Sequence, residues 1–387
     1  MYFVKRFLLI FTFIFFILPH QIAFGEEEAE LIERANRINN YEILTISQPG
    51  SLFNSVTNGI IKSAINLKSN LTFIGRANVG LEKVLNKNKE EKLTTKENYL
   101  YSLSVKTIHN DVSDLFYSKK VSKSLIDNKI VVSKLTADLY SLNKGDIMQL
   151  VGLNGEILSV EVGEIISDSD MGWFEGVVNK DLGYKLGINR NIQAIIWGTR
   201  ITENHLIEIY KNIKYKKIKV SNRNSTPNKN WVLPNALVKE MFGDFQIKEQ
   251  NGTWITIDQD WKSNNIETKK VPILGNITCH RLMWEPLLGA LNQIVEEGLE
   301  SGLSKEEYKY SGGCYAPRRI SRFDAGGAIS RHAWGIAIDI NTITGYSPRI
   351  VEIFNSWGFA WGGTWTSPDE MHFELRSLSA SISKNNS

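Results

Sequence analysis

Tryptophan is distributed unevenly along the chain, and this asymmetry divides the sequence into two parts. Eight of the ten Trp residues lie at or after position 231, whereas the preceding half is rich in Lys, Asn, Ile and Leu. Between them lies a polar stretch, residues 221–230, without periodic apolar residues, which is typical of a linker. A chain of 387 residues also exceeds the usual size of one domain. We therefore predict two folded parts, residues 26–220 and 231–387.

The N-terminus has the pattern of a targeting segment. Lys5 and Arg6 precede a run of 12 residues, 7–18, that is apolar except for Thr12, and a small-residue pattern ends at Gly25. This order is typical of a secretory signal peptide, and the run is shorter than the about 20 residues that a membrane span needs. We predict a signal peptide over residues 1–25 and a secreted or extracytoplasmic mature protein, without stable membrane insertion. An uncleaved anchor is the alternative.

The charge balance argues against nucleic acid as a partner. The chain has 45 Lys and Arg against 42 Asp and Glu, a formal net charge of +3, and its basic residues form no long block. Binding to a phosphate backbone depends on clustered positive charge, so we expect no nucleic-acid partner.

The first part reads as a β-rich accessory region, as one unit or two subdomains. A strand is expected over residues 41–47 and a helix over 51–65, capped by Ser51. Asn154-Gly155 lies between two apolar runs, which is a strong signal for a β-hairpin. A second hairpin is expected around Asn251-Gly252. The region contains no cluster of chemically reactive residues, so the sequence assigns it no function.

The two cysteines form one candidate disulfide. Cys279 and Cys314 are the only pair available, and after export an oxidising compartment would favour the bond. Two unpaired thiols are the alternative. A zinc site that uses His280 is disfavoured, because these residues lack the usual ligand spacing.

Two histidines and one aspartate in the second part have the pattern of a metal site. His332 precedes Asp339 by seven positions, so we expect His332 in a turn or loop and Asp339 on an apolar strand over residues 336–340. A buried carboxylate needs a partner, and a metal ion supplies one. His372 completes a set of three ligands, which is the layout of catalytic zinc.

Further residues complete the expected site. Asp369 lies three positions before His372 and is positioned to act as general base for an attacking water. Two helices are expected to flank these motifs. One covers residues 284–299, and the other covers 347–357 with Ser347 as its cap and Pro348 in its first turn.

The order of these motifs resembles a known family. Ser-x-His-x6-Asp, followed by Asp-x-x-His-Phe-Glu after a Trp-Gly-Gly-x-Trp segment, is similar to the zinc D,D-peptidase family over about residues 270–376. This family includes VanY-type D-alanyl-D-alanine carboxypeptidases and L-alanyl-D-glutamate endopeptidases. The resemblance implies Zn²⁺ bound by His332, Asp339 and His372, with Asp369 as the base.

The resemblance also implies two further roles. An arginine that stabilises the developing oxyanion falls at Arg318, with Arg319 as the alternative, and Ser330 falls at a position that helps to hold the substrate. Ser330 as a simple cap of the turn stays an alternative. The family base is often Glu, so Asp369 and the Trp-Gly-Gly segment favour the endopeptidase-like branch.

Together these features predict an α+β protein. A C-terminal zinc peptidase domain of the hedgehog/D,D-peptidase type, with helices packed on a small antiparallel sheet, follows the β-rich N-terminal region. The predicted function is hydrolysis of peptidoglycan stem peptides, as an L-alanyl-D-glutamate endopeptidase. The alternatives are a D-alanyl-D-alanine carboxypeptidase and, from another class, an inactive wall-binding or sensory protein with a peptidase-like domain.

Overall fold

The structure is a computed structural model. It describes residues 43–48, 50–172, 174–198, 202–213, 218–222, 232–250, 253–304, 313–320, 327–341, 343, 345–365 and 368–378. The predicted signal peptide and most of the predicted linker lie outside the described residues. Residues 221 and 222, at the start of that linker, belong to a strand.

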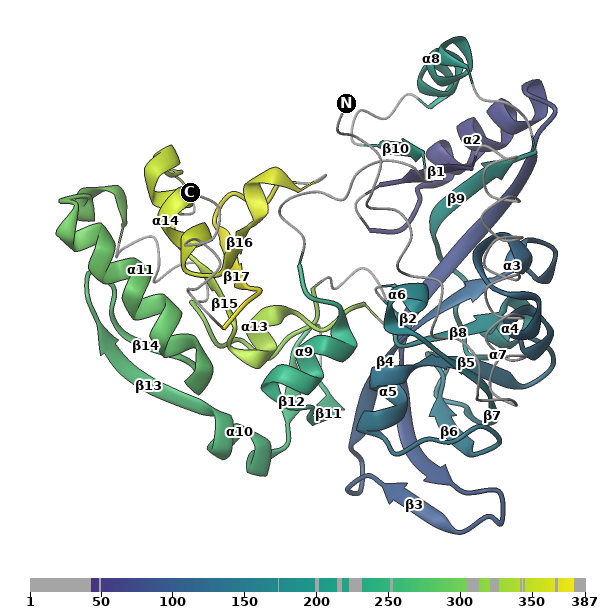
Figure 1. The fold of residues 1–387 in the computed structure, drawn as a ribbon, viewed down its shortest axis with the longest axis horizontal. Helices are drawn as coiled ribbons and strands as arrows, with labels where there is room; N and C mark the ends of the chain where they lie inside the picture. The colour runs from purple at the N-terminus through teal and green to yellow at the C-terminus, as the bar shows by residue number, and fades with distance from the viewer. Residues whose placement is uncertain are drawn as a thin grey trace, which may run out of the picture.

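A closed ring of six strands forms the centre of the N-terminal region (Figure 1). The ring runs in the order β2 (Asn70–Leu85), β6 (Ile147–Val151), β7 (Ile157–Ile166), β5 (Lys129–Ser133), β8 (Gly176–Asn179) and β4 (Leu100–Ile108), and β4 pairs with β2 again. Val79, Leu81, Leu103, Val105 and Ile130 are among its fully buried side chains. The ring is therefore a small barrel filled by aliphatic residues.

The remaining N-terminal elements extend or cover this barrel. The long strand β2 continues past the ring into a second sheet made with the strands β9 (Asn191–Trp197), β1 (Leu44–Ser47) and β10 (Lys219–Asn222), and it also pairs with β3 (Glu91–Thr94). The helices are α2 (Asn54–Asn66), α3 (Asn110–Phe116), α4 (Lys119–Ser124), α5 (Lys134–Leu139), α6 (Asp168–Met171), α7 (Lys180–Lys185) and α8 (Glu203–Asn212). The predicted β-rich character of this region is confirmed.

Three elements connect the two halves of the chain. They are α9 (Asn235–Phe242), β11 (Gln246–Glu249) and β12 (Ile255–Ile257). Strand β11 pairs with the barrel strand β4, where Gln246 lies opposite Tyr101. In α9, the buried Lys239 ammonium lies 2.7 Å from the buried Glu175 carboxylate of the barrel region. The second half of the chain thus begins by adding a hairpin to the sheet of the first half.

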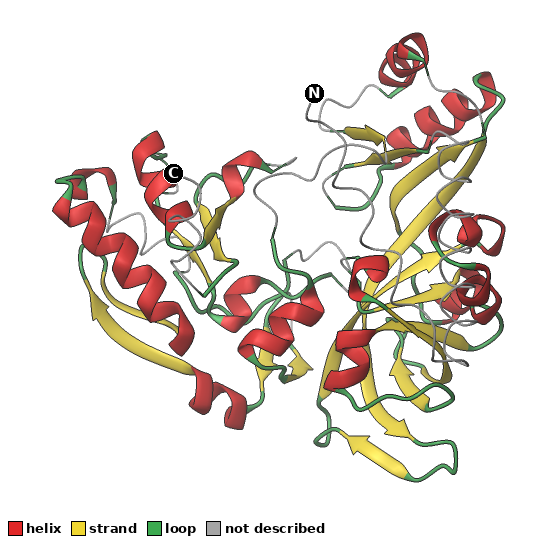
Figure 2. Cartoon of the chain, viewed as in Figure 1, coloured by secondary structure: helices red, strands yellow, loops and turns green. Residues whose placement is uncertain are grey.

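The C-terminal region packs helices on small sheets (Figure 2). After the helix α10 (Gln259–Asn265) comes a hairpin of β13 (Ile266–Val271) and β14 (Gly275–His280). An antiparallel sheet follows in the order β15 (Ala337–Asp339), β17 (His372–Leu375) and β16 (Phe359–Trp361). The other elements are η1 (Arg281–Met283), α11 (Trp284–Glu296), η2 (Glu300–Gly302), α13 (Arg331–Trp334), α14 (Pro348–Ser356) and η3 (Gly362–Thr364). The predicted α+β character and the small C-terminal antiparallel sheet are confirmed.

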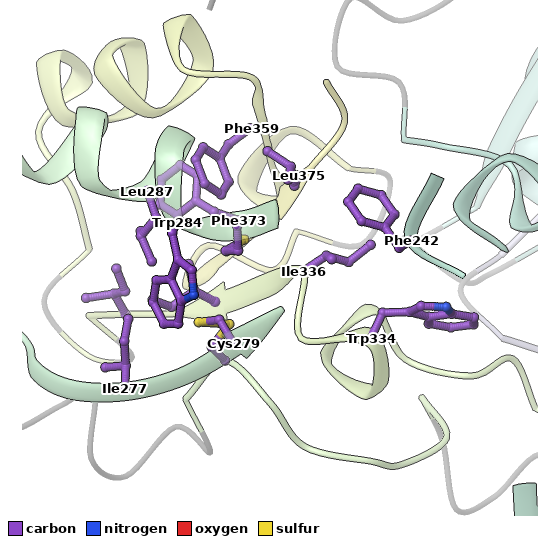
Figure 3. Close-up of a cluster of buried hydrophobic side chains, with 14 of the residues drawn as sticks. Phe242, Ile277, Cys279, Trp284, Leu287, Trp334, Ile336, Phe359, Phe373 and Leu375 are labelled. Atoms are coloured by element: carbon purple, nitrogen blue, oxygen red, sulfur yellow. A yellow bond between two sulfur atoms is a disulfide. The ribbon is translucent and has the colours of Figure 1, made fainter. Parts of the chain in front are cut away.

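One hydrophobic cluster stabilises this region beneath the motifs (Figure 3). Phe373 of β17 stacks on Phe354 of α14, with ring centroids 4.3 Å apart. Leu287 and Leu291 of α11 are fully buried in the same cluster. The Cys279–Cys314 disulfide belongs to the same buried cluster, with Cα atoms 5.4 Å apart, so the predicted bond is confirmed. Helices α11 and α14 therefore share one hydrophobic cluster with the small sheet.

Several local expectations can be compared with the observed elements. The Asn154-Gly155 turn joins β6 to β7, with Gly155 at φ 81°, as predicted. Ser347 caps α14 by accepting a hydrogen bond from the Ile350 N–H. The predicted cap at Ser51 is wrong, because α2 begins at Asn54 and the Gln48 side chain accepts from the Phe53 N–H instead. None of the described helices is long and apolar enough to cross a membrane.

Candidate active site

Three buried side chains meet at one point at the edge of the small C-terminal sheet. Asp339 Oδ1 lies 3.2 Å from His332 Nε2 and 2.9 Å from His372 Nδ1, and the two nitrogens are 3.3 Å apart. All three residues are buried. Four ligand atoms around a zinc ion, each at about 2.0–2.1 Å in a tetrahedron, lie roughly 3.3 Å from one another. The observed triangle is therefore the right size for three ligands of one metal ion.

Local structure explains why these residues meet. Asp339 and His372 are directly opposite each other on β15 and β17, so their side chains lie on the same face. His332 lies in α13, a single helical turn before β15, where the sequence predicts a turn or loop. Gly335 ends that turn at φ 68°, and a Cβ at this position would lie 2.7 Å from the His280 backbone nitrogen. Glycine here allows the chain to reverse from α13 directly into β15.

The outward-facing nitrogens of both imidazole rings have hydrogen-bond acceptors. His332 Nδ1 lies 3.0 Å from the Cys314 carbonyl oxygen, and His372 Nε2 lies 3.2 Å from Glu374 Oε2. In the neutral imidazoles these nitrogens carry the proton and donate it outward, and the other nitrogen of each ring then directs its lone pair at Asp339. Two lone pairs and a carboxylate oxygen in mutual contact repel one another unless a cation lies among them. The donor set thus fits a metal ion, and its outward partners are those that orient metal-bound histidines.

The electrostatics of the cluster show the same preference for positive charge. Burial alone would raise the pKa of Asp339, but its contacts with His332 and His372 hold that pKa well below its usual range. Burial alone would lower the pKa of His372, whereas its contacts with Asp339 and Glu374 raise it to about 9. Without a metal ion, the cluster retains a proton. A divalent cation would displace that proton when it binds.

Asp369 is held beside this cluster by the glycine-rich segment before it. The Asp369 N–H donates to the Gly362 carbonyl oxygen at 3.1 Å, and a Cβ on Gly362 would lie 2.5 Å from the Asp369 carbonyl oxygen. The His372 N–H in turn donates to that Asp369 carbonyl oxygen at 3.1 Å. Burial raises the pKa of Asp369, and the negative charge of Asp339 raises it further. The positive charges of His372, His332 and Arg318 act in the opposite direction, but the net pKa is raised. Asp369 is thus a carboxylate with increased basicity next to the three metal-ligand candidates.

The two neighbouring arginines, Arg318 and Arg319, interact with different residues. The positive charge of Arg318 is close enough to Asp369 to act against the rise of its pKa. Arg319 instead forms an ion pair with Glu249 and donates from Nη1 to the Gly327 carbonyl oxygen at 2.6 Å. Of the two arginines, Arg318 is therefore the one that the structure brings to the candidate site.

Ser330 has a structural role at the start of α13. Its hydroxyl oxygen caps α13 by accepting a hydrogen bond from the His332 N–H at 3.3 Å, and its own N–H donates to the Arg318 carbonyl oxygen at 3.0 Å. The capping alternative of the sequence analysis is therefore observed. A role in holding substrate stays a prediction.

Two further residues belong to this site that sequence reasoning did not select. Arg331 is buried between Glu374, at 3.7 Å, and the start of α9, where its Nη1 donates to Asn235 Oδ1 at 3.0 Å. The sequence feature that could have identified Arg331 is its position between Ser330 and His332 in the motif. The Trp365 ring lies beside His372, with ring centroids 5.2 Å apart.

These features define a class of site. Two histidines and an aspartate converge with their lone pairs inward, and a partly buried carboxylate and an arginine lie close by, which is the arrangement of a catalytic rather than a structural metal centre.

Comparison with known protein families finds a match to one segment of the chain. Residues 324–375, which contain the three metal-ligand candidates and Asp369, match the family model described as D-alanyl-D-alanine carboxypeptidase. This match confirms the resemblance to the zinc D,D-peptidase family over that segment. A comparison of the chain with curated proteins found no match.

Proposed function

We propose that this protein is an exported zinc-dependent peptidase that hydrolyses peptidoglycan stem peptides at the L-alanyl-D-glutamate bond. The observation that carries this proposal is the triangle of His332 Nε2, Asp339 Oδ1 and His372 Nδ1, with sides of 2.9 to 3.3 Å, beside Asp369. The family match over residues 324–375 supports the peptidase chemistry and a substrate from the cell wall.

In this proposal, His332, Asp339 and His372 hold zinc. A zinc ion with three protein ligands supplies Lewis-acid polarisation and makes water a better nucleophile near neutral pH. The protein contributes the orientation of the ligands, since Cys314 and Glu374 fix the imidazole rings from outside.

Asp369 is the proposed proton carrier. Its raised pKa suits a group that accepts a proton from the attacking water and later returns it to the amine of the departing peptide. Arg318, whose positive charge acts on Asp369, would stabilise the negative charge that develops on the scissile carbonyl oxygen. Ser330 would contribute its hydroxyl to substrate contact in addition to its capping role.

Two separate features support the proposed location outside the membrane. The Cys279–Cys314 disulfide is stable in oxidising compartments, which agrees with the predicted signal peptide over residues 1–25. The cell wall lies outside the membrane, so export would bring the enzyme to its substrate.

A D-alanyl-D-alanine carboxypeptidase is the second candidate function, because the matched family carries that description. The two activities cut different bonds of the same stem peptide. Mass spectrometry of purified peptidoglycan after digestion distinguishes them. New D-glutamate amino termini support the endopeptidase, and release of free D-alanine supports the carboxypeptidase. Absence of both products, from a protein that contains one zinc per chain, would overturn the proposal.

A further inference from the structure

One tryptophan is exposed close to the candidate site. Trp254 has 51% of its surface exposed, although indole side chains usually have most of their surface buried. It lies at the start of β12, in the hairpin that joins the barrel to the C-terminal region. Tryptophan is enriched at binding interfaces because its ring is apolar and its N–H is polar, so an exposed indole next to the arginine segment is a candidate for ligand contact.

Backbone hydrogen bonds attach Trp254 to the arginine segment. Trp254 forms a β-bridge with Arg318. The bridge is flanked by two hydrogen bonds: the Ile255 N–H donates to the Pro317 carbonyl oxygen at 3.1 Å, and the Arg319 N–H donates to the Thr253 carbonyl oxygen at 2.8 Å. The other strand of this hairpin, β11, pairs with the barrel strand β4. The barrel therefore fixes the position of the hairpin that carries Trp254.

The bridge also fixes the direction of the indole. Residues directly opposite each other in an antiparallel pair place their side chains on the same face. Trp254 therefore faces the same side as Arg318, whose carbonyl oxygen accepts a hydrogen bond at 3.0 Å from the N–H of Ser330, two positions before His332. The next residue, Arg319, lies on the opposite face of the hairpin, where it forms an ion pair with Glu249. The indole is thus directed to the side of the site.

The surroundings of the indole indicate the chemistry of its ligand. Thr256 lies two residues along the strand from Trp254 and opposite Lys248, so these side chains share its face. Gln250 Nε2 donates to Thr256 Oγ1 at 2.5 Å. A flat apolar ring beside a row of polar groups matches a sugar ring, which has an apolar C–H face and a rim of hydroxyl groups.

We infer that Trp254 binds the glycan part of the substrate and makes the enzyme prefer stem peptides that are still attached to their sugars. This inference rests on the proposed function. The L-alanyl-D-glutamate bond is one residue away from the sugar-linked end of the stem, so a substrate cut there brings its sugar next to the reacting atoms. Trp254, one β-bridge away from Arg318, is placed to meet that sugar.

The test compares two substrates that differ only in the disaccharide at the amino end of the stem peptide. For Trp254→Ala, kcat/KM with the sugar-bearing peptide should fall about tenfold, the scale of one lost aromatic contact, mainly through a higher KM. With the free peptide it should change less than twofold. Trp254→Phe should retain most of the preference. Thr253→Ala, on the opposite face of the same hairpin, should match the wild type on both substrates.

A binding measurement separates this inference from the proposed function. In an Asp369→Asn background, calorimetry with each peptide should show about tenfold weaker binding of the sugar-bearing peptide after Trp254→Ala, whether or not the wild type hydrolyses it. Equal losses for both peptides, or no loss for either, would overturn the glycan contact. If the wild type cleaves neither peptide but the binding difference is found, the proposed function fails and the glycan contact stands.

Discussion

His332 Nδ1 donates a hydrogen bond to the carbonyl oxygen of Cys314 at 3.0 Å. Cys314 is also bonded to Cys279 at the end of β14, so a covalent link connects that hairpin to the residue that orients a metal-ligand candidate. Partners of this kind fix the ring orientation of a histidine ligand and its tautomer. The disulfide therefore bears on metal binding as well as on stability.

Loss of the disulfide should affect both properties. For Cys314→Ser we expect the free energy of unfolding to fall by about 3.5 to 4 kcal/mol, the chain-entropy value for a loop of this size. Zinc affinity should fall about tenfold or more, because the carbonyl that holds His332 is less fixed. Thermal melts and zinc titration check the two effects. Two free thiols in the unfolded, unreduced wild-type protein would rule out the bond.

The metal-ligand assignment predicts a joint loss of zinc and activity. His332→Ala or His372→Ala should remove bound zinc, because three protein ligands leave no redundancy. The matched control is His280→Asn. His280 is buried in the same region but hydrogen-bonds to the Phe242 carbonyl oxygen, so this variant should keep its zinc. Metal analysis of the purified proteins gives the answer, and full zinc occupancy in either ligand variant would contradict the assignment.

Asp369 should be separable from metal binding. Asp369→Asn keeps the size of the side chain but cannot accept the proton, so kcat should fall by about 100-fold or more while zinc content stays unchanged. Steady-state kinetics and metal analysis on the same sample check this expectation. If the variant loses its zinc, Asp369 is a ligand and not the base.

The two arginines should behave differently. Arg318→Ala should lower kcat by roughly 100-fold with zinc retained, because a charge at the developing oxyanion stabilises the transition state more than the ground state. Arg319→Ala breaks an ion pair with Glu249 and should leave kcat near the wild-type value. The reverse pattern in the kinetics would show that Arg319 is the oxyanion donor.

His280 should make stability depend on pH. Burial lowers the pKa of His280 to about 4, so the unfolded chain binds a proton below about pH 6.5 that the folded chain does not bind. Stability from this residue is therefore complete above pH 6.5 and is lost as the pH falls toward 4. Between pH 7 and pH 5 the loss should be about 2 kcal/mol. Denaturant titrations of the wild type and His280→Asn at both values check it, and equal losses in both proteins would exclude His280 as the cause.

Much of the candidate site could be predicted from the sequence because its parts are local. The alternation of apolar residues around Asp339, the turn glycine at 335 and the capped helix over residues 347–357 each act over a few positions. The observed elements β15, α13 and α14 follow those local signals closely. Convergence of His332 and His372 was expected from the chemistry of a three-ligand site and from the family resemblance, since local periodicity does not bring together residues 40 positions apart.

The parts that could not be predicted depend on long-range contacts. The closed ring requires β4 to return to β2, and two of its strand pairs are parallel, which no local pattern indicates. The role of Arg331 depends on α9, almost 100 positions earlier in the chain. Ser51 does not cap α2 because the helix begins at Asn54 with Phe53 as its N-cap residue, whose N–H donates to the side chain of Gln48, five residues earlier.

The pairing of β11 with β4 limits how freely this peptidase segment can be recombined with other proteins. A fragment that starts at residue 231 would carry β11 as an open sheet edge, and Lys239 would lose the carboxylate of Glu175. Open edges favour aggregation, and Lys239 would keep only Asp244, at 3.5 Å, as its acidic partner. A change of accessory region during evolution would have to supply an equivalent strand and an equivalent acid at the same time. The barrel and the peptidase segment are thus expected to be inherited as one unit.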